Sequence, residues 1–147
     1  MDRKYAYVIS IAFIASILDQ LTKFAVKQNA GINGSIPIIG KIFHITYITN
    51  TGSAFGLFKG LNLLFILISI AVMIILIFFF KRVKKESKAE QALFGLLLGG
   101  IIGNLADRLM LGYVIDFIDF RIWPVFNLAD SLITIGVIGL IAVHWKK

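Results

Sequence analysis

The sequence contains no cysteine, and only 16% of its residues are charged. Without cysteine, disulfide bonds, thiol catalysis and cysteine-based metal sites are excluded. Histidine is also scarce, since His44 and His144 stand far apart and form no cluster of the metal-ligand type. The residues thus offer no Cys or His cluster for a metal.

The scarcity of charge accompanies an excess of apolar residues. Hydrophobic residues make up 59% of the chain, and the mean hydropathy is +0.89. A soluble domain has about 45–50% apolar and about 25% charged residues. A small domain leaves much of its surface in water, so its core could not absorb this excess. We therefore expect a mainly α membrane protein with residues 1–147 as a single domain.

The apolar residues are grouped into runs of the length that a bilayer requires, about 20 residues. The expected transmembrane helices lie at about 5–26, 61–80, 92–111 and 126–145. The first follows a basic start, as a secretory signal would. No small-residue cleavage motif ends it, so we expect a retained helix. In the third, Gly95, Gly99 and Gly103 share one face, where a neighbouring helix can approach closely.

The basic residues predict the orientation of the helices, because cytoplasmic loops are rich in Lys and Arg. Nine of the fifteen basic residues fall on one side: Arg3, Lys4, Lys81, Arg82, Lys84, Lys85, Lys88, Lys146 and Lys147. The net charge of +7 is thereby explained by topology, and we expect no nucleic-acid partner. Both termini are then cytoplasmic. The connections at about 28–60 and 112–125 are extracytoplasmic.

The longer outer connection has features of its own. Residues 41–49 (KIFHITYIT) are β-branched and aromatic, which predicts a short strand or two. A turn is expected at Asn50–Gly52, followed by an apolar re-entry at the membrane surface over 53–58. In the shorter connection, Trp123 is placed where an interfacial anchor is expected.

The polar residues of the spans converge on one layer near the outer leaflet. They are Asp19, Lys23, Asn104, Asp107, Arg108, Asn127 and Asp130, with Asp116 just beyond the third span. A charge at the centre of a membrane helix costs about 2.5–3.5 kcal/mol on insertion scales. Several charges at one depth therefore predict a polar cavity that opens outward, and intramembrane ionisable residues indicate a functional site.

Asp116 and Asp130 could act together in this layer. Two carboxyl groups in a partly desolvated site do not both ionise easily, so one keeps a proton near neutral pH. One ionised and one protonated aspartate form a general base and a general acid, which can activate water against a peptide bond. The simpler alternative is a pair of carboxylates at helix ends, one of them beside a helix N-terminus.

Five motifs in this order resemble those of the lipoprotein signal peptidase (signal peptidase II) family. They are DQLTK at 19–23, NTGSAFG at 50–56, GGIIGNLADR at 99–108, VIDF at 114–117 and FNLAD at 126–130. The resemblance implies an intramembrane aspartic endopeptidase that removes signal peptides from prolipoproteins, cleaving before the diacylglyceryl-modified cysteine. It also implies four transmembrane helices with a small extracytoplasmic β-cradle and loop.

The resemblance also assigns residues and partners. The catalytic residues would be Asp116 and Asp130, and the substrate-binding residues Asp19, Lys23, Asn50, Gly52, Asn104, Arg108 and Asn127. No metal or cofactor is implied. The implied partners are diacylglyceryl-modified prolipoproteins, membrane lipids and globomycin-type inhibitors. We expect a monomer in the bacterial cytoplasmic membrane with its active site near the outer leaflet.

Several residues keep a second interpretation. Asp19 and Lys23 can pair at i, i+4, which is a structural role. Arg108 either extends to the lipid headgroups or hydrogen-bonds the substrate. We expect Asp107 to form an ion pair with another helix, Asp119 to be an exposed loop charge, and Asp116 to be the least buried residue of the polar layer.

Two other functions compete with the peptidase. Membrane carboxylates also serve proton relays, so a proton-coupled carrier is one alternative. Against it, the polar residues do not continue to the inner face, and the internal repeats common in transporters are not evident. A helix-packing protein without chemistry is the other.

Overall fold

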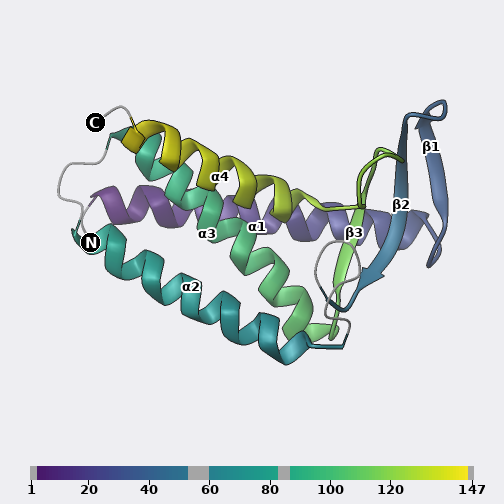
Figure 1. The fold of residues 1–147 in the computed structure, drawn as a ribbon, viewed down its shortest axis with the longest axis horizontal. Coiled ribbons are helices and arrows are strands. Elements are labelled where there is room, and N and C mark those ends of the chain that lie inside the picture. Colours follow the sequence, from purple (N-terminus) through teal and green to yellow (C-terminus); the bar gives the residue numbers. More distant parts are fainter. Residues whose placement is uncertain (1–2, 53–59, 83–86, 146–147) are drawn as a thin grey trace.

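Four long helices make up most of the chain (Figure 1). The computed structural model describes residues 3–52, 60–82 and 87–145. The helices are α1 (Arg3–Asn29), α2 (Asn62–Arg82), α3 (Lys88–Met110) and α4 (Leu128–Trp145). Each is long and apolar enough to cross a membrane. The predicted mainly α membrane fold is confirmed, although α1 and α3 start earlier than expected.

Glycines bring α3 close to α1. A Cβ atom on Gly99 would lie 2.6 Å from the Cβ of Ala15, and one on Gly103 would lie 2.5 Å from Oδ2 of Asp19. Side chains at either position would push the helices apart. The predicted role of the glycine ladder in helix packing is confirmed, and Gly103 also makes room for a buried carboxylate.

A small antiparallel sheet completes the fold. Its strands are β1 (Ser35–Ile39), β2 (Phe43–Asn50) and β3 (Val114–Asp119), in the order β1-β2-β3. β2 lies in the segment where a strand or two was predicted, and β1 precedes it within the outer β-region expected at about 28–60. We missed β3 because its residues are nearly all buried, so its pattern VIDFID lacks the polar–apolar alternation of a half-exposed strand. The predicted re-entry at 53–58 lies outside the described residues.

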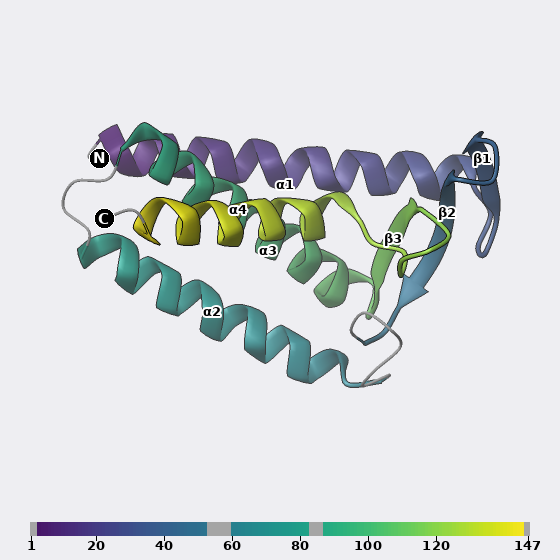
Figure 2. The same ribbon diagram turned by 45° about the horizontal axis from the view of Figure 1, so that its top comes forward.

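The sheet lies at one end of the helices, and the start of α1 and the end of α4 lie at the other (Figures 1 and 2). β3 connects α3 to α4, and it pairs with β2 so that Asp116 stands opposite Ile48 and Val114 opposite Asn50. The sheet therefore brings Asp116 and Asn50 to the sheet end of the bundle, where α4 begins.

Candidate active site

Asp130 is held at the start of α4 by the local sequence. Asn127 is the residue before the helix, and Asp130 is its third residue. The backbone N–H of Asn127 donates to Oδ2 of Asp130 (3.2 Å), and the N–H of Asp130 donates to Oδ1 of Asn127 (2.9 Å). This reciprocal pair is a capping box. It places a carboxylate at the positive end of the helix dipole, where negative charge is stabilised.

Asparagines connect Asp130 to Asp116. Nδ2 of Asn127 donates to Oδ1 of Asp116 (2.7 Å), and Nδ2 of Asn50 donates to Oδ2 (2.8 Å). Nδ2 of Asn104 donates to Oδ1 of Asp130 (2.8 Å). Asn127 thus contacts both aspartates, and both carboxyl groups belong to one hydrogen-bonded cluster contributed by β2, β3, α3 and α4.

A buried lysine sets the orientation of Asn104. Nζ of Lys23 lies 2.8 Å from Oδ2 of Asp19 and 3.0 Å from Oδ2 of Asp107, and it donates to Oδ1 of Asn104 (3.0 Å). Since Oδ1 of Asn104 faces this ammonium group, its amide nitrogen faces Asp130. The predicted pairing of Asp19 with Lys23 is confirmed.

Asp19 and Lys23 are 0% and 1% exposed, and neither is among the residues that line the cavity next to the aspartates. Asn104 lines the cavity, and Lys23 contacts Asn104 without reaching the cavity itself. Gly103 leaves space for Asp19 against α3. On its other side, Oδ1 of Asp19 accepts a hydrogen bond from the N–H of Ala129 in α4 (2.9 Å).

Asp107 joins three elements, which confirms its predicted ion pair with another helix. In addition to its ion pair with Lys23, its carboxylate accepts hydrogen bonds from Nε2 of Gln20 (2.8 Å) and from the N–H of Ile115 (3.0 Å). It therefore attaches β3 to the helices one residue before Asp116. Gln20 was not among the predicted site residues, although an amide beside Asp19 in an apolar helix could have indicated its role.

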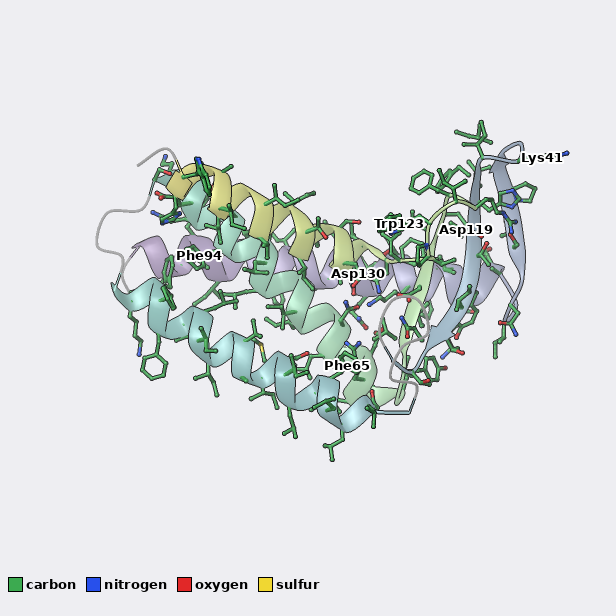
Figure 3. The ribbon with its side chains drawn as sticks, viewed as in Figure 1. Lys41, Phe65, Phe94, Asp119, Trp123 and Asp130 are labelled. Atoms are coloured by element: carbon green, nitrogen blue, oxygen red, sulfur yellow. The ribbon has the colours of Figure 1, made fainter. Side chains whose placement is uncertain are left out.

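A cavity of about 690 Å³ adjoins the two aspartates. Its polar lining is Asn50, Gly52, Asn104, Arg108, Asp116, Asp130, Ser131 and Thr134, and its apolar lining is Phe65, Val114, Ile133, Ile135 and residues 123–126. The guanidinium of Arg108 lies 5.1 Å from the ring centre of Phe65, and Nη2 donates to the carbonyl of Gly52 (3.4 Å). Figure 3 shows Asp130 between Phe65 on α2 and Trp123 beside the sheet.

The surroundings of Asp116 favour its protonated form. Burial, followed by the negative charge of Asp130, raises the pKa of Asp116 to about 7, although hydrogen bonds from Asn50 and Asn127 act in the opposite direction. The expectation that Asp116 is the least buried polar residue is wrong, because it is only 3% exposed while Asp130 is half-buried. The reason is that Asp116 sits in β3 and not in an open loop.

Asp119 was predicted to be an exposed loop charge, and this is also wrong. It ends β3 with 5% exposure. Its Oδ2 accepts a hydrogen bond from the hydroxyl of Thr46 (2.7 Å), and its Oδ1 accepts one from the backbone N–H of Arg121 (2.8 Å). Burial would raise the pKa of Asp119, but these hydrogen bonds and the charge of Arg121 outweigh it and lower the pKa.

Comparisons with known proteins agree with the predicted family. Residues 11–146 match the sequence profile of signal peptidase (SPase) II. The chain is 42% identical to a lipoprotein signal peptidase of Halothermothrix orenii over 95% of this chain and 96% of that protein. It is 43% identical to one of Moorella thermoacetica over 88% and 87% of the two chains.

The fold agrees as well. A solved structure described as a bacterial membrane enzyme matches with a TM-score of 0.88 and 37% identity, covering 95% of this chain and 87% of that one. The family profile spans most of the chain and includes all the polar residues of the site. The chain therefore belongs to the signal peptidase II family and is a multi-pass membrane aspartic peptidase.

Proposed function

We propose that this peptidase removes signal peptides from bacterial prolipoproteins and cleaves before the diacylglyceryl-modified cysteine. The relatives that match nearly the whole chain are lipoprotein signal peptidases. The observation that carries the mechanism is the contact of one asparagine, Asn127, with two aspartates beside a cavity. In this proposal Asp116 and Asp130 are the catalytic pair.

The two aspartates take different roles in the proposed reaction. Asp130 lies at the helix N-terminus, which stabilises a carboxylate, so it takes a proton from the attacking water. Asp116, whose pKa is raised, keeps a proton near neutral pH and gives it to the carbonyl oxygen. Water attacks the carbonyl carbon, which gives a tetrahedral intermediate with two hydroxyl groups. When its C–N bond breaks, the leaving amine takes the proton that Asp130 received, and one of the two hydroxyl groups returns a proton to Asp116, so both aspartates regain their starting forms.

The remaining lining residues provide binding groups for the substrate. Arg108 and Asn50 offer hydrogen-bond donors to the peptide backbone, while Gly52 lines the cavity beside them. Asn104 and Asn127 hold the aspartates, and we infer that Asp19 and Lys23 orient Asn104 without contacting substrate. The apolar wall, with Phe65 of α2 and Ile133 of α4, suits the acyl chains of the lipidated cysteine.

The proposed orientation puts both termini in the cytoplasm and the cavity near the outer leaflet. It is supported by the basic residues Lys81 and Lys88, which lie at the ends of α2 and α3 remote from the sheet. We also propose that the protein acts as a monomer. We further propose that membrane lipids surround the helices and that globomycin-type peptides occupy the cavity.

The cleavage proposal is tested with the purified protein and two forms of one prolipoprotein. The diacylglyceryl-modified form should be cut immediately before the modified cysteine, as read by mass spectrometry of both products. The unmodified form should be cut much more slowly, because it lacks the acyl chains that the apolar wall accepts. Equal rates, or cleavage at another bond, would show that the lipidated cysteine is not what the site recognises.

The raised pKa of Asp116 predicts a loss of activity in alkali. As pH rises through about 7, Asp116 loses its proton and the pair loses its general acid, so kcat/KM should fall. Asn50→Ala removes a hydrogen bond that stabilises the ionised form. The alkaline limb of the pH profile should therefore move to higher pH. Asn29→Ala, at an exposed asparagine of α1, is the matched control. If the alkaline limb of the Asn50→Ala profile stayed at the parental pH or moved to lower pH, Asp116 would not be the group that titrates.

A further inference from the structure

Residues 120–126, here called the wall loop, follow β3 and form a closed loop beside the cavity. The loop is joined at its base, where the N–H of Ile118 donates to the carbonyl of Phe126 (2.7 Å) and the N–H of Phe126 donates back (3.2 Å). Residues 123–126 line the cavity. The position of this loop therefore sets the shape of one cavity wall.

Asp119 connects the wall loop to β2. One carboxylate oxygen accepts the hydroxyl of Thr46, and the other accepts the backbone N–H of Arg121 inside the loop. Nη1 of Arg121 also lies 3.6 Å from Oδ2 of Asp119. A hydrogen bond to a charged and buried acceptor is stronger than one between neutral groups. Asp119 is thus a buried anionic link between the loop and the sheet.

Arg121 adds a second connection between the wall loop and the sheet, and it does so from a backbone conformation that is unusual for a residue with a side chain. Its φ is 66°, in the left-handed region that glycine adopts without strain and that other residues rarely adopt. Its Nη2 donates to Oγ of Ser35 (2.9 Å) and lies 2.6 Å from Nδ1 of His44. The side chain thereby ties the loop to β1 and β2.

Asp119 is separate from the catalytic pair, although it follows Asp116 by three residues in the same strand. Side chains alternate between the two faces of a strand, so positions separated by three residues lie on opposite faces. Asp116 lines the cavity, whereas the face of β3 that carries Asp119 also carries Ile115 and Phe117, which belong to a core cluster with Tyr47. Asp119 therefore contacts the loop and not the reacting atoms.

We propose that Asp119 is a positioning residue for the peptidase: by holding the wall loop against β2, it fixes the cavity wall against which the substrate binds. This inference rests on the proposed function of the cavity. A loosened wall loop weakens substrate binding while the hydrogen bonds of Asp116 and Asp130 stay intact. Loss of Asp119 should therefore raise KM and leave kcat nearly unchanged.

The test uses Asp119→Asn and Thr46→Val, made in a Trp145→Phe background so that Trp123 is the one remaining tryptophan. KM for a diacylglyceryl-modified prolipoprotein should rise about tenfold in each, the effect of losing one hydrogen bond to a buried charged group. The fluorescence anisotropy of Trp123 should fall, because the loop moves more freely. Thr49→Val is the matched control on β2, at a residue that pairs with Ile115 and not with the wall loop.

A fall in kcat with KM unchanged, or an anisotropy equal to that of the Thr49→Val control, would overturn the proposal. If Asp119→Asn does not fold, Thr46→Val decides alone, since it removes one hydrogen bond and leaves the carboxylate in place. The anisotropy of Trp123 needs no turnover, so this test stands apart from the proposed function. An unchanged anisotropy would contradict the role of Asp119 alone, whereas a lack of cleavage by the parent protein would contradict the proposed function alone.

Discussion

Asp116→Asn and Asp130→Asn should each lower kcat by at least about 10³-fold, because each removes the general acid or the general base from the pair. Asparagine keeps the size of the side chain but neither carries the proton of Asp116 nor accepts one in place of Asp130. The measurement is single-turnover cleavage of a diacylglyceryl-modified prolipoprotein, which separates the chemical step from product release.

Thermal unfolding distinguishes lost chemistry from lost structure in these variants. Asp116 is buried with a raised pKa, so its ionised form is disfavoured in the folded protein, and stability attributable to it decreases as pH rises toward 7. Asp116→Asn should therefore be at least as stable as the parent at alkaline pH. Asn29→Ala, at an exposed residue of α1, is the control and is expected to keep both kcat and stability. Turnover of either catalytic-pair variant at the parental rate would show that the assignment is wrong.

Lys23→Met should destabilise the protein by about 3–5 kcal/mol, the usual effect of removing one partner of a buried ion pair. Lys23 is in contact with Asp19 and Asp107, and all three side chains are at most 2% exposed. Without the ammonium group, two carboxylates remain buried close to one another. The free energy of unfolding in detergent would measure the loss.

Lys27→Met is the matched control for Lys23→Met, since Lys27 lies one turn further along α1 and is exposed. It should change stability by at most about 0.5 kcal/mol. Adding Asp107→Asn to Lys23→Met should recover part of the loss, because one uncompensated charge is removed. Equal stability of the Lys23→Met and Lys27→Met proteins would contradict the argument that the ammonium group holds the polar layer together.

Much of the site could be predicted because membrane burial makes polar residues conspicuous. Asn104, Asp107 and Asp130 stand out in apolar helices, and their place along each span predicts a common depth. Asp107 in an ion pair with another helix followed from the same reasoning. Asp116 and Asp119 lie outside the spans, where no such contrast exists, and their burial was predicted wrongly.

By itself, the sequence determined the four apolar helices, the polar layer at one end of them and the membership of a peptidase family. These follow from local composition and from motifs, which need no knowledge of packing. Only the tertiary structure decided that β3 joins β2, that Asn127 contacts both aspartates and that Asp119 ties the wall loop to the sheet. The contacts that decide these points, Asn127 with Asp116 and Thr46 with Asp119, join residues on different secondary-structure elements. They depend on the register of the sheet and the approach of the helices, which local patterns do not specify.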